Sequence, residues 1–178
     1  MTAIIGIEAN GHVYVGGDSM VGNGWGEKGV TSLRKVFRTG EFLIGYTSSF
    51  RMGQILQHHL IVRSQEKGEP DERYMVVGFI EAVRNVLKEK GYAEVSDNRE
   101  KGGEFLVGYR GRLYLADSDF QINHFSAGIA ACGAGKNYSL GAALAMPNMK
   151  PHKRILRALE IAARLSSFVC PPFYVEKL

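Results

Sequence analysis

The chain has 178 residues, of which 45% are hydrophobic and 22% are charged. This size and composition predict a single globular domain over residues 1–178, and the net charge of +4 comes from scattered basic residues, which disfavours a nucleic-acid partner. Neither a signal-peptide pattern nor a long apolar run is present, so a cytoplasmic protein without a membrane partner is expected.

The first 18 residues predict two short strands joined by a tight turn. Asn10-Gly11 lies between two apolar runs and favours a hairpin because both residues tolerate a positive φ. Thr2 would then start the first strand and be held in the sheet. If Met1 is removed, Thr2 combines a hydroxyl nucleophile with a free α-amine that can serve as its base, which is a catalytic device.

The next segment predicts a loop followed by a second hairpin. Residues 19–29 are polar and rich in glycine, so an exposed loop is expected. Trp25 lies in this loop and is interpreted as a surface contact or a subunit contact, with the second favoured because an isolated tryptophan rarely lacks a partner. Residues 33–46 predict the hairpin, with Thr39-Gly40 at its turn.

Two helices are predicted to follow. Ser48 or Ser49 is the expected N-cap of the first, which runs through residues 52–60. Residues 74–90 repeat apolar side chains at helical spacing and predict the second helix. Gly91 is its expected C-cap, because glycine adopts the left-handed conformation at little cost.

The second half begins with strands again. Residues 92–103 are polar and are expected to be flexible, whereas residues 104–117 predict a hairpin. Two further short strands are predicted over residues 120–125 and 128–132. The chain thus returns to the strand-rich pattern of its first half.

Another pair of helices is predicted near the end, over residues 137–145 and 153–168. Residues 173–175 can add an edge strand after Pro171-Pro172. Paired helices between strand hairpins are incompatible with single βαβ crossovers. Two antiparallel sheets, face to face and flanked by helix pairs, would bury every apolar face, so the predicted fold is an α+β four-layer αββα sandwich.

Several short motifs stand in a fixed order: Thr2-Ala3-Ile4-Ile5-Gly6-Ile7, Asn10-Gly11-His12-Val13, Gly17-Asp18, Lys28-Gly29, Arg34-Lys35-Val36, Ile44-Gly45, Cys132-Gly133-Ala134-Gly135 and Ala158-Leu159-Glu160-Ile161-Ala162. In this order they resemble β subunits of the proteasome type, and most closely the bacterial HslV-type peptidases, which are N-terminal nucleophile (Ntn) hydrolases. The resemblance covers nearly the whole chain. It implies the same four-layer fold that the order of strands and helices predicts independently.

The resemblance implies a role for four residues. Thr2 would become the first residue after removal of Met1, its hydroxyl would attack a peptide carbonyl, and its α-amine would take up the hydroxyl proton, directly or through a water. Lys35 would act beside it as a cation, and Asp18 would hold Lys35 charged and in place. The backbone N–H of Ser48 is the best candidate to stabilise the oxyanion.

Three features depart from the family pattern. Ala134 stands where a serine is usual, and Arg164 stands at or next to the place of an acidic residue in the last helix, although Ser167 can match the serine that follows it. The loop around Ser48 reads Tyr46-Thr47-Ser48-Ser49-Phe50-Arg51 in place of small residues. A backbone N–H survives this change, but a different substrate pocket is expected.

Three functions are therefore considered. The first is a threonine-type endopeptidase subunit of a self-compartmentalised protease, for which the resemblance implies unfolded polypeptide substrates, a homo-oligomeric hexamer or heptamer ring that can be stacked, and an AAA+ unfoldase partner. The second is a non-catalytic assembly protein with the same fold and ring interfaces, which Ala134, Arg164 and the altered loop favour. The third is a small-molecule amidase of the Ntn class.

No cofactor or metal is expected. Residues 130–137 (AACGAGKN) are similar to a phosphate-binding P-loop but lack its first glycine and its final serine or threonine. His58 and His59 are adjacent, so on a helix they point in different directions and cannot share a metal ion by that spacing. Cys132 and Cys170 lie in apolar surroundings and are expected to be buried thiols.

Overall fold

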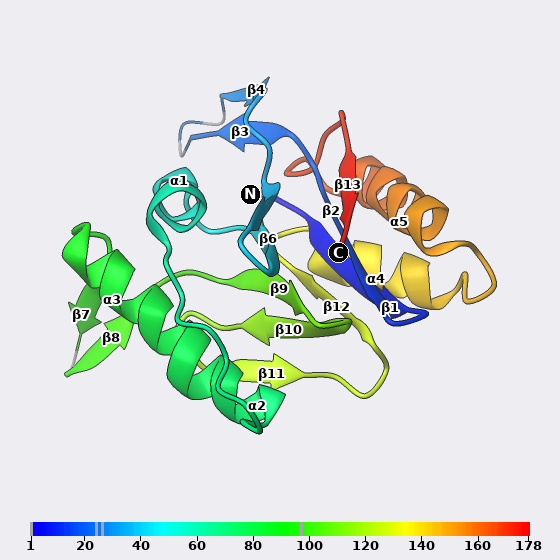
Figure 1. The fold of residues 1–178 in the computed structure, drawn as a ribbon. Helices are drawn as coiled ribbons and strands as arrows, with labels where there is room; N and C mark the ends of the chain where they lie inside the picture. Colours follow the sequence, from blue (N-terminus) through cyan, green and yellow to red (C-terminus); the bar gives the residue numbers. More distant parts are fainter. Residues whose placement is uncertain (1, 24, 26, 97) are drawn as a thin grey trace.

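The computed structural model describes residues 2–23, 25, 27–96 and 98–178. Two antiparallel sheets lie face to face within this part of the chain (Figure 1). The first sheet has the strand order β12 (Ile129–Cys132), β1 (Ile4–Ala9), β2 (His12–Gly17) and β13 (Tyr174–Lys177). The second has the order β11 (Ile122–His124), β10 (Arg112–Ala116), β9 (Phe105–Tyr109), β6 (Phe42–Tyr46) and β5 (Val36–Thr39).

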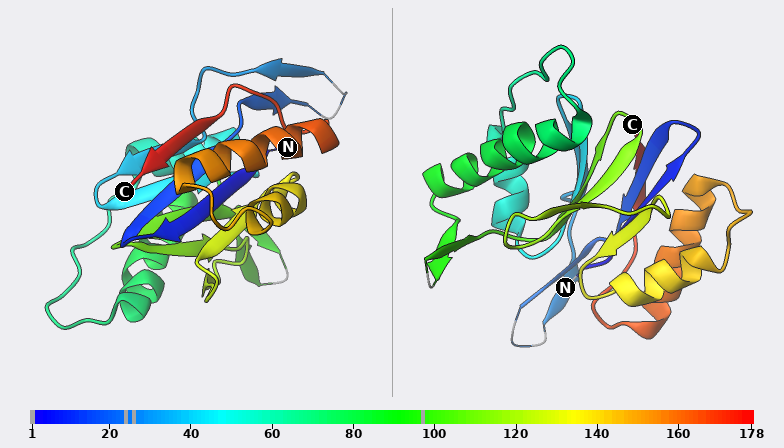
Figure 2. Two further views of the ribbon diagram at one scale, coloured as in Figure 1. Left: turned by 90° about the vertical axis from the view of Figure 1, so that its right-hand side faces the viewer. Right: turned by 90° about the horizontal axis from the view of Figure 1, so that it is seen from below.

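Helices cover the outer side of each sheet, as the two views of Figure 2 show. The four-stranded sheet carries α4 (Lys136–Leu144) and α5 (Pro151–Leu165). The five-stranded sheet carries α1 (Phe50–His59), α2 (Asp71–Tyr74), the π-helical turn η1 (Met75–Ile80) and α3 (Glu81–Glu89). The predicted αββα sandwich is therefore confirmed.

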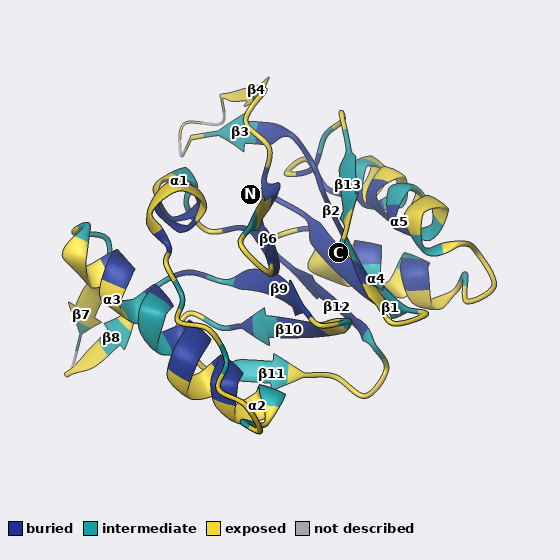
Figure 3. Cartoon of the chain, in the orientation of Figure 1, coloured by how far each residue is buried: buried dark blue, intermediate teal, exposed yellow. Residues whose placement is uncertain are grey.

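The buried apolar side chains form three clusters that match this arrangement. Figure 3 shows that the central strands of both sheets consist mostly of buried residues. One cluster lies between α4, α5 and the four-stranded sheet, and another lies between the remaining helices and the five-stranded sheet. The third fills the space between the two sheets and includes Ile4, Val15 and Leu43. Strands buried on both faces explain why β1, β6 and β9 read as continuous apolar runs.

The first hairpin has the predicted turn. Asn10 and Gly11 adopt φ values of 53° and 73°, and β1 and β2 pair from Ile4–Gly17 to Ala9–His12. The C-terminal strand β13 pairs with β2 at the edge of this sheet, as expected. Both ends of the described chain are thus held in one sheet.

The helix caps follow the sequence with one distinction. Ser49 caps α1, since its Oγ accepts hydrogen bonds from the N–H groups of Arg51 and Met52 at 3.1 and 3.5 Å. Ser48, the alternative cap, precedes it with a φ of 68°. The C-cap of α3 is Lys90, and Gly91 follows it with a φ of 69° and donates to the Lys88 carbonyl at 3.1 Å, so the predicted glycine ends the helix one residue beyond the cap.

Two polar segments contain short hairpins that were not predicted. β3 (Met20–Gly22) pairs with β4 (Lys28–Val30), and β7 (Glu94–Ser96) pairs with β8 (Arg99–Lys101). The prediction of a loop over residues 19–29 was wrong, and the expected flexibility of residues 92–103 stays a prediction. Neither hairpin could be predicted because these strands carry few apolar residues and lie outside the main sheets, where packing does not impose alternation. Ion pairs from Glu100 of β8 to α3 take the place of apolar burial.

Two other expectations differ in detail. The helix predicted over residues 74–90 begins at Asp71 and passes through η1 before α3, with Gly78 packed against the ring of Tyr74. Trp25 is 92% exposed, and its expected subunit contact stays a prediction.

None of the helices in the described part of the chain is both long and apolar enough to span a membrane.

Close packing between the sheets makes Gly45 sensitive to any side chain. A Cβ at this position would lie 2.6 Å from Ile4 and 2.7 Å from Val15, both in the facing sheet. We expect Gly45→Val to lower the free energy of unfolding by about 1–3 kcal/mol through overpacking. Urea denaturation followed by circular dichroism measures this change.

Gly141 of α4 provides the matched control, because a Cβ there meets nothing within 4 Å. We expect Gly141→Ala to raise the free energy of unfolding by about 0.5–1 kcal/mol, since alanine is the better helix former. Equal unfolding midpoints for Gly45→Val and the wild type would contradict the close approach of the sheets.

Candidate active site

Three polar side chains from separate parts of the chain meet at one end of the sandwich. Thr2 lies two residues before Ile4, the first residue of β1, whereas Asp18 directly follows β2 and Lys35 directly precedes β5 of the other sheet. Lys35 Nζ donates to Thr2 Oγ1 at 2.8 Å and to Asp18 Oδ1 at 2.9 Å. All three residues are less than 5% exposed. The structure therefore brings together three of the four residues singled out from the sequence.

Asp18 is fixed by the main chain as well as by Lys35. Its Oδ1 accepts the N–H of Ala3 at 3.1 Å, and its Oδ2 accepts the N–H groups of Met20 at 3.0 Å and Cys170 at 3.3 Å. Hydrogen bonds to a carboxylate are charge-assisted and therefore strong. Asp18 thus holds the start of β1, the start of β3 and the segment after α5 around one buried charge.

Burial and the neighbouring Asp18 have opposite effects on the pKa of Lys35. Burial lowers the pKa of Lys35 below its ordinary value of 10.5, because an ammonium loses hydration in the interior. The negative charge of Asp18 and its hydrogen bond act in the opposite direction and favour the charged form. A buried ammonium in contact with the Thr2 hydroxyl can stabilise negative charge that develops on that oxygen.

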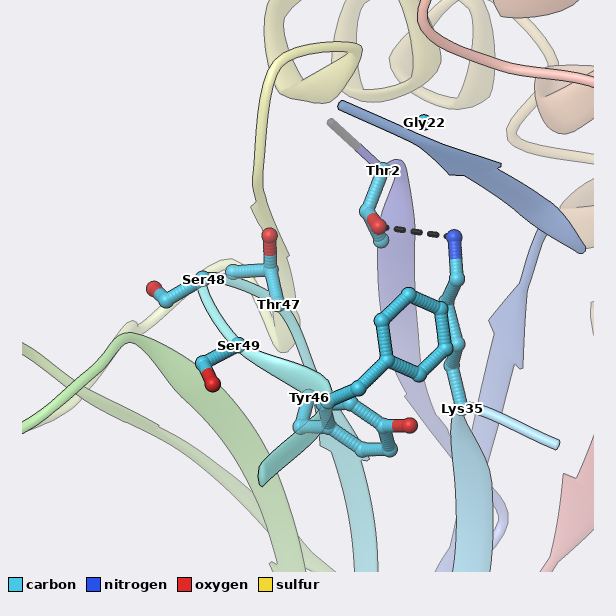
Figure 4. Close-up of a pocket in the computed structure, with 8 residues that line it drawn as sticks. Thr2, Gly22, Lys35, Tyr46, Thr47, Ser48 and Ser49 are labelled. Carbon is cyan, nitrogen blue, oxygen red and sulfur yellow. Dashed lines mark hydrogen bonds between the residues drawn. The ribbon is translucent and has the colours of Figure 1, made fainter. Parts of the chain in front are cut away.

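Ser48 lies in the loop between β6 and α1 and faces the same pocket as Thr2. The pocket has a volume of about 80 Å³. Its lining residues, drawn in Figure 4, are Thr2, Gly22, Lys35, Tyr46, Thr47, Ser48, Ser49 and Phe50. Within the described part of the chain, the Ser48 N–H donates to no protein acceptor, while its Oγ accepts the Glu104 N–H at 3.0 Å. Ser48 is thus able to offer a backbone donor to a bound group.

Tyr46 and Phe50, which were not predicted as site residues, line the pocket. The rings of Tyr46 and Phe50 meet edge to face with centroids 6.1 Å apart, and Lys35 Nζ lies 5.8 Å from the centroid of Phe50. Burial raises the pKa of Tyr46 to about 12, so its phenol is neutral at physiological pH. The departure of this loop from small residues was the signal for an altered pocket.

The turn after β12 contacts the backbone of Thr2. Gly135 donates to the Thr2 carbonyl at 3.0 Å, and a Cβ on Gly133 would lie 2.6 Å from that carbonyl oxygen. Ala134, between them, is exposed and brings no hydroxyl. Arg164 is exposed near the end of α5, and neither Ala134 nor Arg164 lines the pocket around Thr2.

Other sequence-based expectations have mixed outcomes. Cys132 is buried as expected, whereas Cys170 is partly exposed, because it follows α5 at the rim of the sandwich. Among the residues that the structure describes, no cluster of three or more His, Cys, Asp or Glu side chains could hold a metal ion. Met1, whose removal is the condition for a free amine on Thr2, lies outside the described residues.

The fold of the chain is similar to that of several solved structures, whereas its sequence matches no known family model. No curated protein matches the chain either. A solved structure of Thiobacillus denitrificans BPH in complex with epoxomicin is 19% identical, with a TM-score of 0.81 over 99% of this chain and 98% of that one. HslV from Trypanosoma brucei is 21% identical, with a TM-score of 0.70 over 99% and 98%.

A third similar structure is Anbu, described as an ancestral β subunit, from Yersinia bercovieri. It is 12% identical, with a TM-score of 0.67 over 99% of this chain and 81% of that one. The chain has a proteasome-like Ntn-hydrolase fold. At these identities the similarity establishes the fold, and the resemblance to the HslV type in particular stays a prediction.

The buried ion pair predicts a specific stability defect. We expect Asp18→Asn to lower the free energy of unfolding by about 3–5 kcal/mol, because it leaves the Lys35 ammonium buried without a counter-charge. At a pH below the pKa of Lys35 in the folded protein, the ammonium is charged in both states, and the folded state bears the full cost of burying it. As the pH rises from that pKa toward 10.5, the value in the unfolded chain, the folded protein loses the charge first, so the loss of stability in Asp18→Asn should become smaller. Urea denaturation at several pH values measures it.

Glu176→Gln is the control for this variant, because it removes the more exposed ion pair with Arg34. A surface pair of this kind is worth about 0–1 kcal/mol. Equal losses in Asp18→Asn and Glu176→Gln would contradict the isolation of the Lys35–Asp18 pair from solvent.

Proposed function

We propose that the chain is the subunit of a threonine-type endopeptidase, with Thr2 as the nucleophile after removal of Met1. The contact of the Thr2 hydroxyl with the buried Lys35 ammonium, at 2.8 Å, carries this proposal. Burying an ion pair costs free energy of hydration, and a buried ammonium that faces a hydroxyl at the wall of a pocket is typical of functional sites. A nucleophile that develops negative charge gains from this contact.

The geometry supports the following sequence of steps. The Thr2 hydroxyl attacks the carbonyl carbon of a peptide bond, and its proton passes to the Thr2 α-amine, directly or through a water. Lys35 stabilises the charge on Oγ1, and Asp18 keeps Lys35 protonated. The Ser48 N–H stabilises the tetrahedral oxyanion. The protonated amine then gives its proton to the leaving nitrogen, and water hydrolyses the resulting ester to free Thr2.

The similar structures support an assembly around this chemistry. BPH and HslV match over almost their whole length, and Anbu carries the description of a β subunit. By this resemblance the protein forms a homo-oligomeric ring, a hexamer or heptamer that can be stacked. It resides in the cytoplasm, receives unfolded polypeptides and works with an AAA+ unfoldase. The 92% exposed side chain of Trp25 is suited to a contact between subunits.

A non-catalytic assembly protein is the second candidate. Ala134 brings no hydroxyl to the turn that contacts Thr2, and Arg164 stands in place of an acidic residue. Both departures leave the fold intact while removing groups that the resemblance implies near the nucleophile. The third candidate, an Ntn amidase, is favoured by the small volume of the pocket, about 80 Å³.

Peptide hydrolysis tests the nucleophile directly. We expect Thr2→Ala to lower kcat/KM for fluorogenic peptides by about 10³-fold or more, because it removes the attacking oxygen. Thr39→Ala, at the last residue of β5 and outside the pocket around Thr2, is the matched control and should keep wild-type activity. Intact mass must also show loss of Met1. Equal activity of the wild type and Thr2→Ala would exclude the mechanism.

Covalent labelling separates the endopeptidase from the assembly protein. Epoxomicin, which is present in the BPH complex, is a suitable probe. We expect one adduct per chain on the N-terminal peptide that contains Thr2, and none in Thr2→Ala. A folded wild-type protein that lacks Met1 and gives no adduct would instead support the non-catalytic function.

A further inference from the structure

Two loops from different sheets flank Thr2. Residues 47–49 follow β6 of the five-stranded sheet, and residues 133–135 follow β12 of the four-stranded sheet. They approach each other closely, since a Cβ on Gly133 would lie 2.6 Å from the Thr2 carbonyl oxygen and 3.0 Å from Thr47 Oγ1. The distance from the Ser48 N–H to the Thr2 hydroxyl therefore depends on how these two loops are held together.

Glu104, which precedes β9, contacts both loops. Its carbonyl accepts the Thr47 N–H at 3.1 Å, and its own N–H donates to Ser48 Oγ at 3.0 Å. Its carboxylate reaches across to the other sheet, where Oε2 accepts the Gly133 N–H at 3.2 Å. Oε1 accepts from Lys136 Nζ, at the start of α4, at 3.4 Å. One residue thus joins the ends of β6, β9 and β12.

The surroundings of the Glu104 carboxylate favour its hydrogen bond with the Gly133 N–H over its contact with Lys136. The Glu104 side chain is 20% exposed, so it is largely removed from water, and its hydrogen bond to the Gly133 N–H is charge-assisted. A negative charge is also favourable beside the first turn of α4. Lys136 is more exposed, at 48%, and contributes less to fixing the geometry.

Ser48 needs such support from its surroundings. Its φ of 68° is uncommon for a serine, and this conformation persists only where neighbouring groups maintain it. The residue before Glu104 packs directly on this loop, because a Cβ on Gly103 would lie 3.0 Å from the Ser48 Cβ. The segment 103–104 therefore restrains the side chain and the backbone of Ser48 together.

We propose that Glu104 is a positioning residue that fixes the Ser48 N–H relative to the Thr2 nucleophile by joining the 47–49 loop to the 133–135 turn. The inference rests on the proposed function, in which these two groups act on one carbonyl. It also explains how the turn keeps its place beside Thr2 with alanine at position 134. Glu104 acts through Ser48 and Gly133, and its side chain does not line the pocket.

Steady-state kinetics of peptide hydrolysis provides the first test. We expect Glu104→Ala to lower kcat by about 10–100-fold with little change in KM, because misplacement by about 1 Å can cost this much. Glu104→Gln should recover most of kcat, since its amide oxygen can still accept the Gly133 N–H. This variant also keeps the proposal testable if Glu104→Ala fails to fold.

Glu100→Ala is the matched control. The Glu100 side chain is 18% exposed and pairs with Arg84 and Lys88, in a hairpin outside the candidate site. It should lose its ion pairs without changing kcat or KM. A drop in kcat for Glu100→Ala equal to that for Glu104→Ala would assign the effect to general destabilisation and overturn the proposal.

Backbone amide hydrogen exchange provides a second test that requires no activity. We expect faster exchange in Glu104→Ala over residues 47–49 and 133–135, and no change there in Glu100→Ala. Unchanged exchange at Gly133, or faster exchange with an unchanged kcat, would overturn the role of Glu104. An inactive wild-type protein whose exchange responds as expected would instead contradict the proposed function.

Discussion

The ion pair between Lys35 and Asp18 constrains the rest of the candidate site. Both side chains are almost fully buried, and such a pair offsets its loss of hydration only when its remaining hydrogen-bonding capacity is used. Asp18 accepts hydrogen bonds from backbone N–H groups of three segments, and Lys35 donates a hydrogen bond to the Thr2 hydroxyl. The Thr2 hydroxyl, which accepts a hydrogen bond from this pair, is thereby held in place beside the pocket that Thr2 lines.

This arrangement depends on both sheets. Asp18 and Thr2 belong to the ends of the four-stranded sheet, whereas Lys35 leads into the five-stranded one. Glu104 forms a second link between the same sheets through its hydrogen bond from the Gly133 N–H. The register of one sheet over the other, set by close contacts such as that of Gly45 with Ile4, therefore determines the geometry of the site.

Much of the fold and part of the site could be predicted from the sequence. Apolar strands buried on both faces and helices in pairs leave few alternatives to a four-layer sandwich, and Asn10-Gly11 fixes the first hairpin locally. The hairpins β3–β4 and β7–β8 could not be predicted in this way, because polar pairings and ion pairs hold them. Neither could the contacts of Cys170 and Glu104 with the site, which involve main-chain groups distant in sequence.

The segment after α5 has a consequence for folding. Ser19 donates its N–H to the Cys170 carbonyl at 3.0 Å, next to the bond from the Cys170 N–H to Asp18. Asp18 and Cys170 are 152 residues apart in the sequence. The carboxylate that orients Lys35 therefore gains one of its backbone donors only when distant parts of the chain have come together. The hydrogen bonds around the Lys35–Asp18 pair are complete only in the folded domain, so partial unfolding after α5 would loosen the surroundings of Thr2 before the sheets themselves separate.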